Sequence, residues 1–369
     1  MIPKGIAEIG KGAFSDCYWL KVHINAPADS YAEKYVKFLA DWQTKFVIES
    51  IDNPFVIKNG YLEKYFGNHS EVVIPDGVTV IRKSVFSGLE NIASVILPAG
   101  VEIIDDFAFC SCKNLASVTL PKSLTTIGND AFCDCSSLTS IHIPESVTRI
   151  GNCAFGGCKS LASVSIPNSV TEIGVEAFGF CDRLTSVVLP SGIQKLGKQV
   201  FSHCSSLSSV VLSEGITAIP YSAFKNCISL KSIVIPKSVT EIEAFAFCEC
   251  IALSSVTIPD GVQKIGDSAF EACTSLTSVT IPESVTEIGA FAFNECVSLE
   301  SIIPSKNLTR IGDSAFRLCA KLSSISIPES VPEIGDATFA YCPNLTIHAP
   351  AGSFAEKWAK KRGIPFKAI

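Results

Sequence analysis

A period of 23 residues governs most of this chain. If the Pro of VVIPDGV, Pro75, is place 1 of a unit, the same place recurs every 23 residues as far as Pro328. Of the twelve unit starts, ten are Pro, and Ser213 and Ser305 occupy the other two. An unbroken array of one short unit is typical of a solenoid, in which each coil is stable only against its neighbours.

The apolar columns of the repeat predict a continuous core. Place 4 is Val, Leu or Ile, place 7 is Ile or Leu, and place 11 is usually Ala. Rings at the same place in successive coils must stack, and each buried Phe contributes roughly 1.5–3 kcal/mol relative to exposure. The Phe column at place 12 is invariant: Phe86, Phe109, Phe132, Phe155, Phe178, Phe201, Phe224, Phe247, Phe270, Phe293, Phe316 and Phe339.

Each unit ends in Leu-x-x-Val-x-Ile/Leu, as in Leu115, Val118 and Leu120. Alternating β-branched residues closed by Pro predict one short strand per coil, and these strands pair in parallel into a curved sheet. The Ala-Phe-x-x-Cys segment is too short for an α-helix and is expected to form a 3₁₀-like turn. We expect positive φ at the Gly of the Ile-Gly pair: Gly128, Gly151, Gly174, Gly266, Gly289, Gly312 and Gly335.

The repeat resembles the leucine-rich repeat, whose general form is LxxLxLxxN/CxL. The fuller unit, IPxSVTxIGxxAFxxCxSLxSVxI, is similar to the BspA-like (Treponema-type) class over residues 75–349. The resemblance implies a β-dominated, right-handed superhelical solenoid with a concave parallel sheet, short helical turns and helical C-terminal caps. It also implies a bacterial surface or secreted protein that adheres to host proteins or other cells, although some members have no assigned role.

Both ends depart from the repeat. Residues 1–45 comprise one more unit, with Cys17 in phase, and a capping segment that starts at Ser30 and Glu33, as at the end of an earlier array. Residues 46–74 are expected to be a linker and an Asn-Gly β-hairpin that caps the solenoid of residues 75–349. Residues 350–369, with Ser353 and Glu356 spaced as a capping box, predict a C-terminal helical cap. We expect the native protein to extend upstream; the alternative is that the lone unit docks on the solenoid.

Sixteen cysteines in an extracellular protein would ordinarily indicate disulfides. Here twelve of them share place 15, where side chains stack about 4.8 Å apart with Cβ vectors unsuited to bridging. We therefore predict a buried ladder of thiols beside the Phe column. The ladder comprises Cys17, Cys112, Cys135, Cys158, Cys181, Cys204, Cys227, Cys250, Cys273, Cys296, Cys319 and Cys342.

The remaining polar residues do not predict chemistry. Cys110 and Cys133 share place 13 of adjacent units and leave a reactive surface pair open, but Cys-x-x-Cys spacing and nearby His are missing, so no metal is expected. The five His residues occupy unrelated places and supply no nucleophile-base pair, so no enzyme and no cofactor are predicted. A net charge of −6 argues against nucleic acid and anionic membranes as partners.

The outward strand positions form the predicted binding face. Place 20 is Ser in eleven successive units, and place 22 carries a Val188–Val211–Val234 run between Ser and Thr positions. The alternative is that Ser merely suits tight curvature. The predicted contact residues on this concave face are His142, Ser163, Ser165, Ser186, Val188, Ser209, Val211, Ser232 and Val234. Rim residues expected to add specificity are Phe180, His203, Tyr221, Lys225, Arg317 and Tyr341.

Three functions are compatible with these patterns. The favoured hypothesis is a monomeric, extracellular or cell-surface module that binds a host extracellular-matrix or surface protein and does not insert into a membrane. The alternatives are a structural spacer that displays other domains and an intracellular scaffold. Residues 1–20 lack a basic segment followed by an apolar run, so the location rests on the resemblance.

Overall fold

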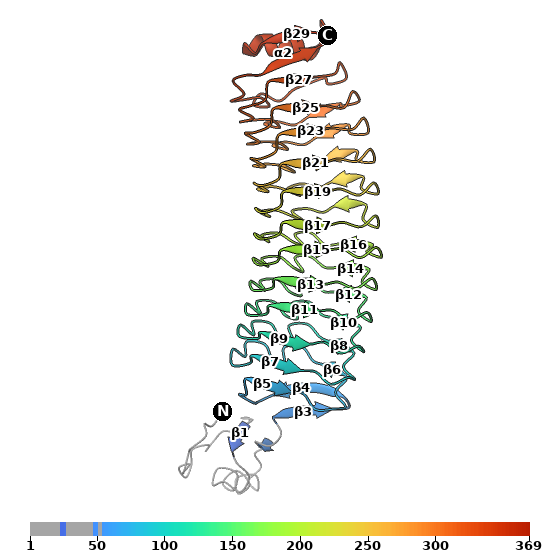
Figure 1. Cartoon of the computed structure of the whole chain (residues 1–369), viewed down its shortest axis with the longest axis vertical. Coiled ribbons are helices and arrows are strands. Elements are labelled where there is room, and N and C mark those ends of the chain that lie inside the picture. Colours follow the sequence, from blue (N-terminus) through green and yellow to red (C-terminus); the bar gives the residue numbers. More distant parts are fainter. Residues whose placement is uncertain (1–22, 27–46, 51–53) are drawn as a thin grey trace, which may run out of the picture.

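The computed structural model describes residues 23–26, 47–50 and 54–369. The described units stack into one long, gently bowed column in which each coil adds one layer (Figure 1). Of residues 1–45, the structure describes only β1 (His23–Ala26), so Cys17 and most of the predicted capping segment lie outside the described residues. β1 pairs in parallel with β2 (Val47–Ser50). The structure is thus a parallel-strand β-solenoid with coils of 23 residues, as the repeat predicts.

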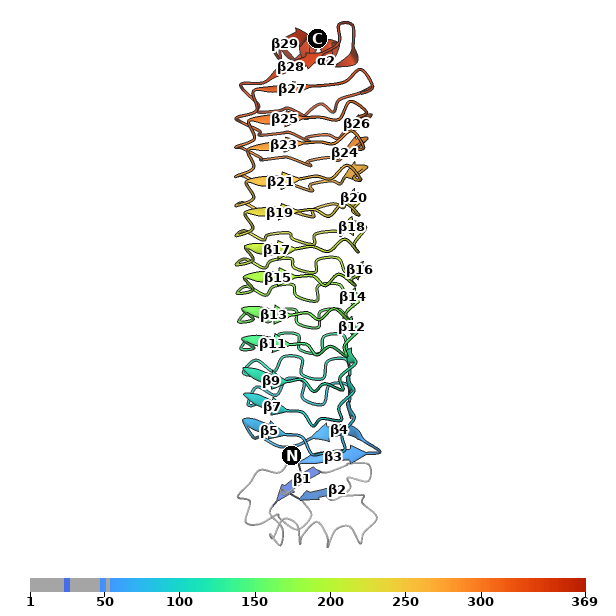
Figure 2. The same ribbon diagram turned by 45° about the vertical axis from the view of Figure 1, so that its right-hand side comes forward.

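Each coil contains two strands. The predicted strand, at places 20–22, is present in every coil as far as β27, and its strands carry odd numbers (Figure 2). Its outward residues alternate with one buried residue, as in β17 (Ser209–Val211). The other members are β5 (Glu71–Val73), β7 (Ser94–Ile96), β9 (Ser117–Thr119), β11 (Ser140–His142), β13 (Ser163–Ser165), β15 (Ser186–Val188), β19 (Ser232–Val234), β21 (Ser255–Thr257), β23 (Ser278–Thr280), β25 (Ser301–Ile303) and β27 (Ser324–Ser326).

The prediction of one strand per coil is wrong, because a second strand of two residues lies at places 6–7. These strands line the opposite flank of the column (Figure 2). Strands of two residues are too short to give an alternation signal. They are β6 (Val80–Ile81), β8 (Ile103–Ile104), β10 (Thr126–Ile127), β12 (Arg149–Ile150), β14 (Glu172–Ile173), β16 (Lys195–Leu196), β18 (Ala218–Ile219), β20 (Glu241–Ile242), β22 (Lys264–Ile265), β24 (Glu287–Ile288) and β26 (Arg310–Ile311).

The Phe column forms the predicted spine. Every consecutive pair from Phe86 to Phe339 stacks face to face, with ring centroids 4.9–5.7 Å apart. Beside the spine, each ladder thiol donates a hydrogen bond to the carbonyl oxygen of the spine Phe in the preceding coil, as Cys112 does to Phe86 at 3.0 Å. All cysteines in the described residues are free, which confirms the thiol ladder there.

The turn between the strands is not a 3₁₀ helix, contrary to the prediction. Its i→i−3 hydrogen bonds are present, as from Cys110 N–H to the Phe107 carbonyl at 3.1 Å, but places 10 and 14 have positive φ in almost every coil. In one coil these places are Phe107 (φ 59°) and Ser111 (φ 58°). A left-handed residue every fourth position interrupts a right-handed helix and converts the segment into successive turns.

The Gly of the Ile-Gly pair also has a different role from the one predicted. None of the predicted glycines has positive φ. Instead, a Cβ on Gly151 would lie 2.5 Å from the carbonyl carbon and oxygen of Gly128 in the preceding coil. Place 8 is therefore Gly in these coils because adjacent backbones approach too closely for a side chain, although four other coils carry a larger residue there.

Both ends of the described solenoid are capped. The hairpin of β3 (Phe55–Lys58) and β4 (Tyr61–Tyr65) turns at Asn59 and Gly60, both with positive φ, and confirms the Asn-Gly prediction. Tyr65 continues the spine below Phe86, with ring centroids 5.1 Å apart.

At the other end, the predicted helix α2 (Phe354–Arg362) begins at Ser353, whose hydroxyl accepts a hydrogen bond from the Glu356 N–H. Trp358 of α2 packs edge-on against Phe339, the last ring of the spine. In the chain, the helix connects β28 (Thr346–Ala349) to β29 (Phe366–Ala368). These two strands pair in parallel with each other, and the sequence did not predict them.

Candidate functional site

The outward side chains of places 20 and 22 form one continuous surface, which we call the serine face. The predicted residues His142, Ser163, Ser165, Ser186, Ser209 and Ser232 are all exposed on it. The middle residue of each strand points into the core, as Val187 does. His142 lies opposite Ser165 across the β11–β13 pair. The structure therefore places all the predicted contact residues on one side of five consecutive coils.

The valine stripe consists of Val188, Val211 and Val234 on this face. Their exposed fractions are 62%, 52% and 74%, and Val188 lies directly opposite Val211 in the β15–β17 pair. The strands β17 and β19 are adjacent, so Val234 continues the stripe. Three exposed β-branched side chains without polar interruption form a small apolar patch within a polar surface.

The predicted rim residues lie on the turn side of the column and form separate groups. Phe180 and His203, at place 14 of adjacent coils, stack with ring centroids 4.5 Å apart. The guanidinium of Arg317 lies over the Tyr341 ring, 5.3 Å from its centroid. Stacked aromatic and cation–π pairs hold these side chains in fixed positions at the surface.

The other two rim residues belong to a third group that the sequence analysis missed. The Tyr221 ring packs edge-on against Phe245 at 5.6 Å, and the Lys198 and Lys225 amines lie 6.0 and 5.8 Å from the Tyr221 and Phe245 ring centroids. The signal for this group was the departure of its coils from the repeat. Place 8 is Gly in most coils but is Pro220 and then Glu243 here.

The sheet of even-numbered strands breaks at this group. Place 8 N–H groups elsewhere bond to the preceding coil, as from Gly197 to the Ile173 carbonyl at 2.8 Å. Pro220 has no N–H to donate to the Leu196 carbonyl oxygen, which is the equivalent acceptor in the preceding coil. Consequently, within the described residues, the strands divide between β16 and β18 into one sheet ending at β16 and another starting at β18.

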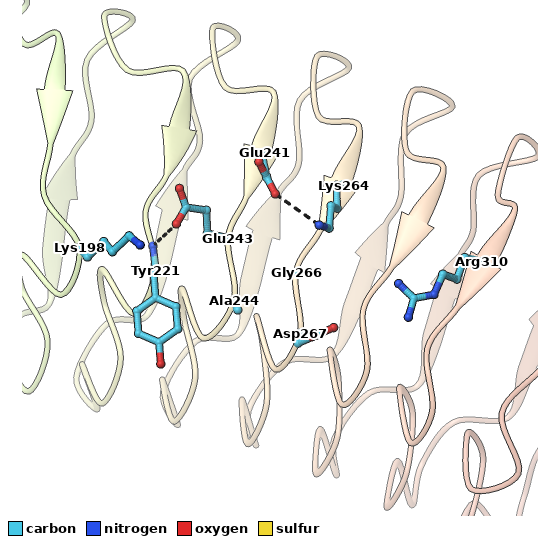
Figure 3. Close-up of a pocket in the computed structure, with 9 residues that line it drawn as sticks. All are labelled: Lys198, Tyr221, Glu241, Glu243, Ala244, Lys264, Gly266, Asp267 and Arg310. Atoms are coloured by element: carbon cyan, nitrogen blue, oxygen red, sulfur yellow. Dashed lines mark hydrogen bonds and ion pairs between the residues drawn. The ribbon is translucent and has the colours of Figure 1, made fainter.

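One shallow cavity spans the break, and a second lies beside it. One, of about 330 Å³, is lined by Leu196, Ala218 and Pro220 among others. The other, of about 300 Å³, extends from Lys198 to Arg310 (Figure 3). Figure 3 shows the Glu243 carboxylate directed at the main chain of Tyr221, whose N–H it accepts at 2.8 Å. In other coils the place 9 N–H is accepted by an Asn or Asp side chain at place 9 of the preceding coil, as Asp267 accepts the Ala290 N–H at 2.8 Å. Glu243 takes over this role for Tyr221.

The outward residues of place 6 between Arg149 and Glu333 form what we call the charged face. Its charges pair between adjacent strands: Glu172 is 3.5 Å from Arg149 and 2.7 Å from Lys195. The Lys195 hydrogen bond, followed by the Arg149 charge, lowers the pKa of Glu172 below its usual value. Its members are Arg149, Glu172, Lys195, Ala218, Glu241, Lys264, Glu287, Arg310 and Glu333.

Two cysteines outside the ladder, Cys133 and Cys153, are not activated thiols. Cys133 and Cys153 are half-buried, and burial is the main cause that raises the pKa of Cys153 to about 11 and that of Cys133 further. Thiols with raised pKa values stay protonated at neutral pH and are poor nucleophiles. In the part of the chain that the structure describes, no group of three or more His, Cys, Asp or Glu side chains is arranged to hold a metal ion.

Across residues 23–26, 47–50 and 54–369, no helix is both long and apolar enough to span a bilayer.

The repeat region matches a known family. Residues 57–148, 125–253 and 240–353 match the family described as BspA type leucine-rich repeat region, with six copies. The three matches overlap and together span residues 57–353, which include all of the serine face discussed above. No curated protein matches this chain significantly.

Several solved structures share the fold. A leucine-rich cell surface protein from Faecalibacterium prausnitzii is 29% identical, with a TM-score of 0.53, over 85% of this chain and 92% of its own. A leucine-rich repeat protein from Bacteroides ovatus is 23% identical, with a TM-score of 0.52, over 88% and 100% of the two chains. The pneumococcal vaccine antigen PcpA is 19% identical, with a TM-score of 0.59, over 84% and 91%.

Proposed function

This chain belongs to the BspA-type leucine-rich repeat family, and from this premise we propose that it is a non-catalytic, protein-binding segment of a bacterial cell-surface or secreted protein. Its partner is a host extracellular-matrix or surface protein, or a protein on a neighbouring cell. Repeat solenoids generally use their extended faces for such contacts. The cell-surface description of the Faecalibacterium relative supports the location.

The valine stripe is the observation that carries this proposal. Val188, Val211 and Val234 are exposed on strands whose inner residues are locked in the core, so the patch is rigid before a partner arrives. A rigid site avoids the entropic cost of ordering on binding. The flanking hydroxyls of Ser186, Ser209 and Ser232 supply donors and acceptors around the apolar centre. Ser163, Ser165 and His142 extend the same surface by two coils.

A patch of this size supports only modest affinity. Hot spots in protein interfaces favour Trp, Tyr and Arg, which the serine face does not carry. Several copies on a cell surface would compensate through avidity. The aromatic groups at Phe180–His203 and at Tyr221 add specificity if the partner extends around to the turn side.

The domain organisation that accompanies this proposal has four parts. We propose that residues 1–45 are the end of a preceding repeat array and that residues 46–74 are a linker and the β-hairpin cap. Residues 75–349 are the binding solenoid, and residues 350–369 close it with α2. In support, the hairpin and α2 both cover an end of the Phe spine, through Tyr65 and Trp358.

The experiment is direct binding of the full chain to a panel of extracellular-matrix and plasma proteins by surface plasmon resonance. The Val211→Arg variant places a charge at the centre of the stripe. Ile303→Arg is the matched control, because Ile303 occupies the same column on β25 and is 63% exposed, outside the stripe.

Saturable binding that Val211→Arg abolishes and Ile303→Arg retains supports the proposed site. Binding that survives in both variants contradicts the stripe as the contact surface and directs attention to the turn side. If no member of the panel binds, the adhesin proposal fails in favour of the alternative below.

A structural spacer is the alternative, and the regularity of the column favours it. Place 20 is Ser in eleven successive coils, and the coils stack without a hinge in the views of Figures 1 and 2. Parallel strands add about 4.8 Å per coil, so twelve coils project a neighbouring domain by about 55–60 Å. A spacer requires neither the valine stripe nor a fixed set of aromatic side chains.

A further inference from the structure

The charged face has an order of charges that is complementary to itself. From Arg149 the signs along the column are plus, minus and plus, then the neutral Ala218, then minus, plus and minus. At equal distances on either side of Ala218, the two residues carry opposite charges. The pairs are Lys195 with Glu241, Glu172 with Lys264, and Arg149 with Glu287.

We propose that this face binds a second copy of the chain, antiparallel to the first, with the two-fold axis at Ala218. A two-fold interface is isologous: if residue i of one copy contacts residue j of the other, then residue j of the first copy contacts residue i of the second. The three complementary pairs therefore become six intermolecular ion pairs. This proposal is independent of the partner-binding proposal and replaces the sequence-based expectation of a monomer.

Ion pairs within one chain do not account for the order of charges. Cross-strand pairs such as Lys264–Glu241, at 3.7 Å, stabilise adjacent strands and favour simple alternation. Simple alternation across Ala218 would place a cation at position 241, as at 195. Position 241 is instead an anion, Glu241, so Lys195 and Glu241 carry opposite charges on either side of the neutral Ala218. The reversal is what an antiparallel pair about Ala218 requires.

The same pattern excludes a parallel pair of columns. If the two-fold axis ran along the column, Glu172 would face Glu172 and Lys195 would face Lys195. Like charges in direct opposition are destabilising and serve to reject the wrong arrangement. Other antiparallel registers form fewer pairs: an axis between Lys264 and Glu287 gives two complementary pairs before Ala218 faces Glu333.

The shape of the face is compatible with this contact. The charged side chains are accessible, with 72% of the Lys195 side chain and 53% of that of Arg149 exposed. At the centre the short side chain of Ala218 lines one cavity together with Lys195, and Glu241 lines the other cavity. The two-fold axis brings the Lys195 side of one copy against the Glu241 side of the other, where these hollows accommodate long side chains.

The contact is long, narrow and electrostatic. From Arg149 to Glu287 it covers six strand spacings of about 4.8 Å, or about 29 Å. Exposed ion pairs are individually weak and are screened by salt, since the Debye length falls from about 10 Å at 0.1 M to about 3 Å at 1 M. We therefore expect a salt-sensitive dimer. The odd-numbered strands lie on the opposite flank, so both serine faces stay free (Figure 2).

The test is sedimentation equilibrium of the full chain at low and high NaCl. We expect a dimer at low salt and a dissociation constant at least about tenfold higher at high salt. Lys195→Glu places a carboxylate opposite Glu241 of the partner subunit and is expected to abolish the dimer. The double variant Lys195→Glu/Glu241→Lys restores the complementary charges and is expected to restore it. Lys237→Glu, on an exposed corner turn, is the control for charge alone.

Zero-length cross-linking of mixed ¹⁴N- and ¹⁵N-labelled protein provides an independent readout. A conjugate of Lys195 from one copy and Glu241 from the other supports the register. A monomer at low salt overturns the proposal. So does a dimer that Lys195→Glu leaves intact, because the interface would then lie elsewhere. A single variant that dissociates but is not rescued by the double variant overturns the register about Ala218.

Discussion

The thiol of Cys227 donates a 3.2 Å hydrogen bond to the carbonyl oxygen of Phe201 in the preceding coil. The same bond recurs throughout the ladder, for example from Cys250 to Phe224 at 3.1 Å. The carbonyl also accepts an N–H from its own coil, as Phe201 does from Cys204 at 3.3 Å. The Cys column therefore has two functions, because it fills space beside the spine and ties each coil to the next.

Removing one ladder thiol should weaken the solenoid measurably. Cys227→Ala loses a buried hydrogen bond and leaves a small cavity, so we expect a loss of roughly 1–3 kcal/mol. Cys153→Ala is the control, because Cys153 is half-buried and lies outside the ladder, and it should cost less than about 1 kcal/mol. Urea unfolding midpoints measure both. Equal midpoints for Cys227→Ala and the parent chain would contradict a stabilising ladder.

The ladder also predicts a pH dependence of stability. Burial raises the pKa of Cys112 to about 12 and those of Cys227 and Cys273 well above the ordinary value. The thiol pKa in the unfolded chain is about 8.5. A thiol with a higher pKa in the folded chain contributes its full stabilisation below that pH, and this stabilisation is lost as the pH rises through the folded-state pKa. Melting temperatures should therefore fall steeply between about pH 9 and pH 11. A melting temperature that is constant over this range would be incompatible with the buried thiols.

The sequence predicts those features that recur in register. The Phe spine, the thiol ladder and the outward Ser column follow from the 23-residue period, because an identical side chain in every coil must stack on its neighbour. The hairpin at Asn59–Gly60 and the helix that begins at Ser353 follow from local turn and capping signals. Both classes of signal need only one sequence and no knowledge of coil-to-coil distances.

Features that depend on coil-to-coil distance were not predictable. Gly at place 8 has two possible roles, positive φ or close approach of neighbouring backbones. Only the fold distinguishes them, because a Cβ on Gly151 would lie 2.5 Å from the Gly128 main chain. The charged face lies on strands of two residues that carry no alternation signal. The break at Pro220 is visible as a departure from the repeat, but which hydrogen bond it removes depends on the structure.

The place 8 glycines provide a direct test of close approach. Gly151→Ala places a methyl group 2.5 Å from the Gly128 main chain, and we expect a loss of about 1–3 kcal/mol from the shift this forces. Gly100→Ala is the control, because its Cβ would meet only the Val78 carbonyl oxygen, at 3.7 Å. That change should be neutral or stabilise by up to about 1 kcal/mol. Similar urea midpoints for the two variants would argue against the packing role.

The junction of α2 with the spine predicts the effect of two changes at Trp358. The indole is 5% exposed, and its ring contacts Phe339 at 5.9 Å, but its N–H has no partner in the described chain. Trp358→Phe keeps the contact and removes the unsatisfied donor, so it should cost less than about 1.5 kcal/mol. Trp358→Ala uncovers the end of the spine and should cost about 3–5 kcal/mol. Thermal melts that rank the two variants equally would exclude this capping role.

The division of the even-numbered sheet at Pro220 should be visible in hydrogen exchange. Thr240 donates its N–H to the Thr217 carbonyl at 2.8 Å, and β20 pairs with β18, so the amides of Thr240 and Glu241 are protected. Thr217 and Ala218 occupy the equivalent places one coil earlier, where the described backbone makes no such bond across the gap to β16. Since exchange reports local opening, their amides should exchange at least about tenfold faster than those of Thr240 and Glu241. Lys264, on the continuous β20–β22 pair, serves as a second protected reference. Equal protection at all five amides would show that β16 and β18 are joined in solution, and the cavities beside Ala218 would then have to be closed.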